Sequence, residues 1–75
     1  MISNPAIELL AAKVHEAWMQ EKRSHGIWSR VSDLTGAELL VPYAELAETD
    51  KDADRVTVRT VLAAIDKSPY VIRER

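Results

Sequence analysis

The chain has 75 residues, of which 47% are hydrophobic and 29% are charged, with a formal net charge of -2 and a pI near 5.6. This length fits one small domain and excludes a second, and the lack of a basic excess argues against a nucleic-acid polymer as partner. Because cysteine is absent, disulfides, thiol catalysis and cysteine-ligated metals are excluded.

The first predicted element is a helix over about residues 5–24. Asn4 can cap the free backbone amides at its start, and Pro5 suits the first helical turn because no amide hydrogen is needed there. Gly26 follows as a natural left-handed stop. The apolar residues of the segment recur three or four apart and form one stripe: Ile7, Leu10, Ala11, Val14 and Trp18.

The segment from 25 to 48 reads as a long connecting loop with one short strand. It contains Gly26, Gly36 and Pro42, and its apolar run Leu39-Leu40-Val41 is too short for a helix. A second short strand at about 70–72, the run Tyr70-Val71-Ile72, could pair with it.

The second predicted helix covers about residues 50–66. Thr49 and Asp52 resemble a capping box, and the acidic first turn suits the helix dipole. Ser68-Pro69 closes the helix, and its apolar stripe consists of Val58, Val61, Leu62 and Ile65. The expected fold class is therefore mainly α: two long antiparallel helices, a long connecting loop and short β-strand segments, in a single domain over 1–75.

The segment lengths and glycines also bear on location and cofactors. No run approaches the roughly 18 apolar residues that a membrane span needs, and the start of the chain lacks a signal-peptide pattern. We therefore expect a cytoplasmic protein without a membrane partner. Glycine occurs only at positions 26 and 36, which leaves no glycine-rich loop to cradle phosphates, and no cofactor is expected.

Two patterns begin like metal sites and then depart from them. His15-Glu16 opens the zinc-protease motif, but the position of the second histidine is Met19. Asp50, Asp52 and Asp54 copy the start of a calcium loop. The required glycine is replaced there by Arg55, and the closing glutamate by Val61. We expect no metal site and, since His15 and Glu16 point to different sides of the helix, no catalytic residue.

The tryptophans leave two interpretations open. Trp18 and Trp28 are either core aromatics that a small domain needs for buried area, or one indole face stays open. In the second case Lys22, Arg23 and Arg30 lie near enough in the sequence to supply positive charge to a planar anion stacked on the ring.

The order of these segments resembles the ryanodine-receptor repeat, or RyR domain. The resemblance rests on "HEAWMQEK", "GIW", "LLVPYAEL", "DKDADRVTVRTVLAAI" and "YVI", and it runs from about Ile7 to Ile72. In bacteria and phages the family occurs as small single-domain proteins, and the chain resembles such a member. It departs from the family after the first helix, where Ser29 and Arg30 replace a tyrosine and a glycine, and Ala37-Glu38 replaces a His-Pro pair.

The resemblance implies a mostly helical, non-enzymatic binding module. In vertebrate calcium-release channels the repeats occur as tandem pairs, and such a pair can hold a planar ligand, including adenine nucleotides, between two tryptophans. Trp18 matches the position of these tryptophans. A single repeat would need a homodimer to build the same cleft. We therefore expect a planar, nucleotide-like ligand, with Trp18, Lys22, Arg23, Trp28, Arg30 and Tyr43 as ligand-binding residues. The alternative is a protein-interaction or scaffold module without a small ligand.

Overall fold

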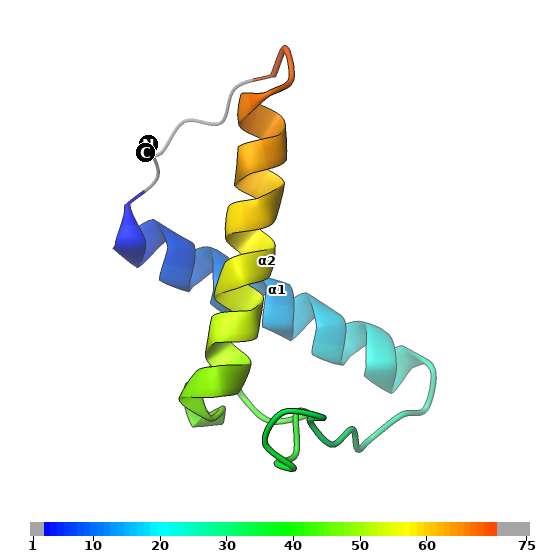
Figure 1. The fold of residues 1–75 in the computed structure, drawn as a ribbon. Coiled ribbons are helices and arrows are strands. Elements are labelled where there is room, and N and C mark those ends of the chain that lie inside the picture. Colours follow the sequence, from blue (N-terminus) through cyan, green and yellow to red (C-terminus); the bar gives the residue numbers. More distant parts are fainter. Residues whose placement is uncertain (1–2, 71–75) are drawn as a thin grey trace.

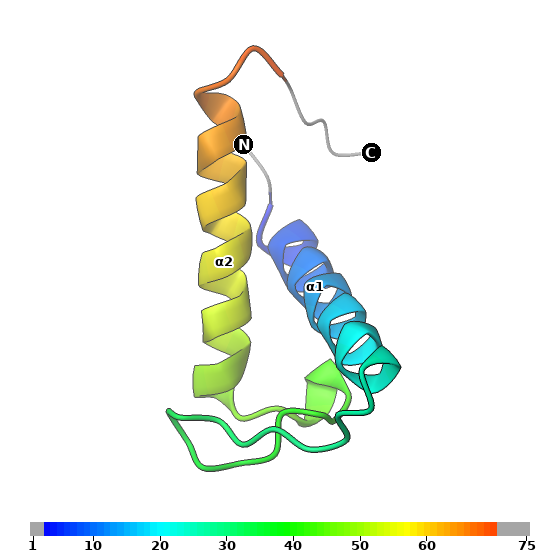
Figure 2. The ribbon, with the colours of Figure 1, turned by 90° about the vertical axis from the view of Figure 1, so that its right-hand side faces the viewer.

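The computed structural model describes residues 3–70, which form two α-helices and one short 3-10 helix. Helix α1 spans Asn4–Ser24, η1 spans Tyr43–Glu45 and α2 spans Glu48–Asp66. The two long helices cross steeply in the view of Figure 1. In the perpendicular view of Figure 2 they lie close together near the start of α1 and diverge toward the bottom, where the connecting segment folds across the open side.

The ends of α1 follow from local backbone chemistry. Ser3, and not Asn4, is the N-cap, because its hydroxyl accepts a hydrogen bond from the Ala6 amide at 3.3 Å. At the other end, the Gly26 and Ile27 amides donate to the carbonyls of Arg23 and Lys22, both at 2.9 Å. Gly26 has a φ of +74°. Such a left-handed glycine closes the helix in a Schellman motif.

Helix α2 begins two residues before the predicted start, and the predicted capping box is wrong. Ala47 occupies the N-cap position and has no side chain that could accept a hydrogen bond there. Thr49 lies inside the first turn. Asp50, on the same turn, turns its carboxylate to the connecting segment instead, where Ser32 and Thr35 donate to it.

The core lies where the helices cross. Ile7, Ala11 and Val58 are buried together, with Leu10, Tyr43 and Leu62 packed around them. Ala11 is fully buried. Its small side chain lets the backbones of the two helices approach each other at the crossing. The predicted stripes are shifted on both helices: Met19 is buried in α1 while Val14 is exposed, and Val61 of α2 is 52% exposed.

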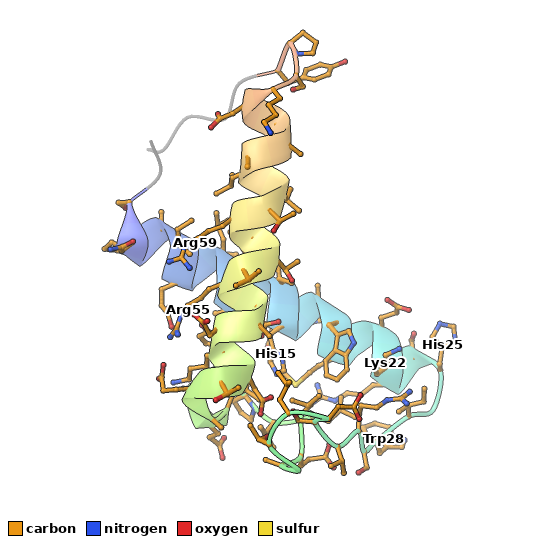
Figure 3. All side chains as sticks on the ribbon, in the orientation of Figure 1. His15, Lys22, His25, Trp28, Arg55 and Arg59 are labelled. Carbon is orange, nitrogen blue, oxygen red and sulfur yellow. The ribbon has the colours of Figure 1, made fainter. Side chains whose placement is uncertain are left out.

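An ion pair joins the helices on the other side of α2 from His15 (Figure 3). The Arg55 guanidinium donates to both carboxylate oxygens of Glu8, at 2.7 and 3.1 Å, and to Glu48 at 3.1 Å. This hydrogen bonding lowers the pKa of Glu8. A guanidinium suits this position because its planar fork matches a carboxylate.

The predicted short strands are wrong. Within residues 3–70 there is no strand, only an isolated antiparallel bridge between Val31 and Glu38. The Leu39 amide does donate to a carbonyl, that of Arg30 at 2.7 Å. The pairing stops there because the Glu38 carboxylate accepts from the Arg30 and Leu40 amides. Tyr70 is exposed and outside any element, and the rest of the predicted second strand, 71–72, lies outside the described residues.

Candidate ligand-binding groove

A groove with a volume of about 510 Å³ lies between α1, α2 and the connecting segment. Its walls come from all three parts of the chain, so the groove exists only once the connecting segment has folded onto the helices. The side chains that line it are Val14, His15 and Trp18 from α1, Arg30, Val31, Ser32, Asp33, Leu34, Leu39 and Leu46 from the connecting segment, and Asp50, Ala53, Asp54 and Thr57 from α2.

His15 and Trp18 form the aromatic wall of the groove. They lie three residues apart on one face of α1, and their rings stack with centroids 5.6 Å apart and planes 29° from parallel. His15 is only 4% exposed, whereas Trp18 is half-buried. The indole is therefore supported by a fixed imidazole and still reaches the groove.

The polar contacts of His15 join three parts of the chain. Its Nε2 lies 2.8 Å from the Val41 carbonyl oxygen, and its Nδ1 lies 3.6 Å from Oδ2 of Asp54. Because a carbonyl oxygen only accepts hydrogen bonds, Nε2 carries a proton. The ring thereby fixes the connecting segment against α1 and places Nδ1 opposite the carboxylate of α2.

Two carboxylates of α2 line the groove in different environments. Asp50 is buried and accepts hydrogen bonds from the hydroxyls of Ser32 at 2.6 Å and Thr35 at 2.7 Å. The Asp54 side chain is 24% exposed. Burial raises the pKa of Asp54, and the nearby His15 opposes that shift. Asp50 is therefore a structural anchor, and Asp54 is a poorly solvated acceptor.

Glu38 holds the part of the connecting segment that carries Arg30. Its carboxylate accepts from the Ser29 hydroxyl and from the backbone amides of Arg30 at 2.7 Å and Leu40 at 3.0 Å. These hydrogen bonds lower the pKa of Glu38 to about 2. Ser29, Arg30 and Glu38 are positions at which the sequence departs from the RyR pattern, and the structure brings all three into contact.

The structure brings together two of the six predicted ligand-binding residues. Trp18 and Arg30 line the groove, and the other four do not. Figure 3 shows Lys22 near the C-terminal end of α1 and Trp28 on the connecting segment. Trp28 is 71% exposed, which is inconsistent with a core role for its indole. Arg23 reaches back along α1 to the sulfur of Met19, at 3.9 Å.

Tyr43 packs against the helix crossing and not in the groove. Its ring contacts the core residues, and Lys51 Nζ lies 5.7 Å from its centroid. The hydroxyl is buried with no hydrogen-bond partner among residues 3–70. Burial, together with the carboxylate of Glu8, raises the pKa of Tyr43 to about 12. The Tyr43 ring also lies beside the His15 ring, with centroids 6.2 Å apart.

Sequence reasoning did not identify His15 and Asp54 as groove residues. A signal was present, because His15 and Trp18 are spaced to share a helix face, as are Asp50 and Asp54. Nothing in the sequence showed that these two faces would meet. In the part of the chain that the structure describes, no three His, Cys, Asp or Glu side chains are arranged to hold a metal ion.

The fold defines a small helical domain with a groove that is built by a connecting segment docked across two crossed helices. Neither α1 nor α2 is long and apolar enough to cross a membrane. The RyR domain family model matches residues 3–74, nearly the whole chain, and the protein belongs to this family. No curated protein matches the sequence.

Proposed function

We propose that this RyR domain is a non-enzymatic binding module that holds a planar, nucleotide-like ligand in the groove against Trp18. One observation carries the proposal: the Trp18 indole stacks on the buried His15 and lines a groove of about 510 Å³. Stacking of a base on an aromatic side chain contributes about 1 to 3 kcal/mol. Preorganised by His15, Trp18 offers this contact without having to be ordered first.

Arg30 supplies the positive charge for a phosphate of such a ligand. Its backbone amide is held by Glu38, and its side chain is exposed and lines the groove. A hydrogen bond from a guanidinium to phosphate contributes about 1.5 to 3 kcal/mol. Stacking and one such contact together permit weak binding, so a second copy of the chain is part of the proposal.

The second copy would cover apolar side chains beside the groove and bring two Trp18 rings to face each other across a twofold axis. Val31 is 56% exposed and Leu34 is 67% exposed, and both line the groove together with the exposed Val14. A domain this small has little core of its own. A homodimer would bury these side chains and close the groove.

The test is to titrate purine nucleotides into the protein and into its Trp18→Ala variant. We expect Trp18→Ala to abolish binding while the variant still unfolds cooperatively. Trp28→Ala is the matched control, because Trp28 is exposed outside the groove, and it should bind as the original chain does. Equal binding by Trp18→Ala and the original chain would refute the proposal.

A second candidate function is a protein-interaction module without a small ligand. The observation that favours it is the exposed apolar surface of the connecting segment, where Trp28 and Leu34 are 71% and 67% exposed. In that case no nucleotide would shift the melting temperature. Trp28→Ala, and not Trp18→Ala, would then release a protein partner that copurifies with the chain.

A further inference from the structure

The two carboxylates of α2 in the groove differ in how their lone pairs are used. Both oxygens of Asp50 accept hydrogen bonds from hydroxyls of the connecting segment. No group among residues 3–70 donates a hydrogen bond to the Asp54 carboxylate. His15 Nδ1 lies 3.6 Å from Oδ2 of Asp54, within ion-pair range when the imidazole is protonated, but that distance is too long for a hydrogen bond.

Asp54 is therefore an acceptor without donors inside a groove. An ionised carboxylate has about four lone-pair sites, and taking it partly out of water is unfavourable unless donors replace the water. Burial raises the pKa of Asp54, which reflects the same deficit of hydrogen-bond donors around the carboxylate. A ligand that brings N–H donors into the groove would remove it.

The neighbours of Asp54 define the shape of that ligand. Asp54 contacts His15, His15 stacks on Trp18, and all three line one groove. Because the imidazole occupies one face of the indole, a ring would stack on the other face and extend across the groove to bring one edge to the carboxylate. Two adjacent N–H donors on that edge would match the two oxygens of Asp54, because paired parallel hydrogen bonds fix orientation as well as adding binding energy.

We propose that the groove selects a base of the guanine type, whose ring N–H and neighbouring exocyclic amino group both donate to Asp54. The inference rests on the proposed function and names the ligand class of that site. Adenine offers only one amino group beside a ring nitrogen that is itself an acceptor, so its lone pair would face the carboxylate. A site built for donors strongly rejects an analogue that lacks them.

The experiment compares GMP, IMP and AMP, which differ in the donors of this edge. Each is titrated up to millimolar concentration into the Trp28→Phe variant, in which the remaining tryptophan emission comes from Trp18. GMP should bind at least tenfold more tightly than AMP. IMP, which keeps the ring N–H and lacks the exocyclic amino group, should fall between them.

Asp54→Asn tests the role of the carboxylate, since the amide keeps its shape and has only one acceptor. In this variant most of the tenfold preference for GMP over AMP should be lost. Asp66→Asn is the matched control, because Asp66 is an exposed carboxylate of the same helix that does not line the groove, and it should keep the preference. An equal loss in both variants would indicate general electrostatics and overturn the inference.

The outcomes separate this inference from the proposed function. Binding that requires Trp18 but is equal for GMP and AMP, or stronger for AMP, overturns the guanine preference and leaves the proposed function standing. No binding of any of the three nucleotides overturns both. A circular dichroism melt of each variant shows whether a loss of binding comes from unfolding.

Discussion

At the scale of single residues, Glu38 determines the course of the connecting segment. One carboxylate satisfies a hydroxyl and two backbone amides, those of Arg30 and Leu40. Donors of this kind prefer the ionised form, so the folded chain holds the pKa of Glu38 at about 2, below its ordinary 4.5. A proton on Glu38 therefore weakens the segment that carries Arg30 into the groove.

The pH dependence of stability should report this residue. Because the pKa of Glu38 is lowered by folding, its contribution is fully present above about pH 4.5 and is lost as the pH falls toward about 2. Glu38→Gln should be less stable at pH 7, and its free energy of unfolding should fall less steeply between these limits. Urea unfolding at a series of pH values measures both effects.

The comparison needs a control because other carboxylates, including Glu8 and Glu48, also have lowered pKa values. Glu45→Gln serves, since Glu45 is exposed and its side chain makes no hydrogen bond within residues 3–70. If Glu38→Gln and Glu45→Gln gave the same pH profile as the original chain, the assigned role of Glu38 would be wrong.

At the scale of the elements, the start of α2 leaves its first amides without a side-chain acceptor. Ala47 has the extended backbone of an N-cap, with φ -62° and ψ 150°, but only a methyl group. Ala47→Ser should stabilise the protein by about 1 kcal/mol, because a serine hydroxyl can accept from the amides of the first turn. Thermal or urea unfolding measures the gain.

Ala44→Ser is the control for this prediction, as Ala44 is an exposed alanine of η1 and caps no α-helix. It should change the stability little. A gain from Ala44→Ser as large as that from Ala47→Ser would point to a general effect of added hydroxyls. No gain from Ala47→Ser would show that water already satisfies these amides.

The helices could be predicted because their signals are local. Apolar spacing and the Gly26 stop lie within the segments themselves, so they act before any tertiary contact forms. The strand at Leu39-Leu40-Val41 and the capping box at Thr49 were predicted from equally local patterns, and both are wrong for a tertiary reason. Glu38 takes the amides that a ladder would need. Helix α2 starts at Glu48 with Ala47 as its N-cap, so Thr49 lies inside the first turn, where its neighbour Asp50 is bonded to Ser32.

The groove was less predictable than the helices. Trp18 and Arg30 were identified from residue type, but twelve positions separate them, and only the docked connecting segment brings both to one surface. Lys22 and Arg23 are closer to Trp18 in the sequence and still do not line the groove. Proximity in sequence is a poor guide when a loop supplies one wall of a site.

At the scale of the whole molecule, the balance of buried and exposed apolar side chains favours self-association. Within residues 3–70 the buried hydrophobic side chains are Ile7, Ala11, Met19, Leu46 and Val58, whereas Leu9, Val14, Trp28, Val31, Leu34, Val56, Val61 and Tyr70 are large and exposed. A single chain of this size is near the lower limit for independent stability. Pairing of two copies over the groove would move Val14, Val31 and Leu34 out of water.

For the homodimer proposed above, Leu34→Glu should shift the equilibrium toward monomer. The side chain is 67% exposed and lines the groove, so the fold of one chain tolerates the change. In a paired interface the glutamate would be buried without a partner, which is strongly unfavourable, and the dimer dissociation constant should rise more than tenfold. Sedimentation analysis over a range of concentrations measures that constant.

Val61→Glu is the control, because it places the same charge on an exposed apolar residue outside the groove. It should leave the dimer intact. A monomeric original chain at all concentrations, or equal weakening by both variants, would mean that the groove is not the dimer interface.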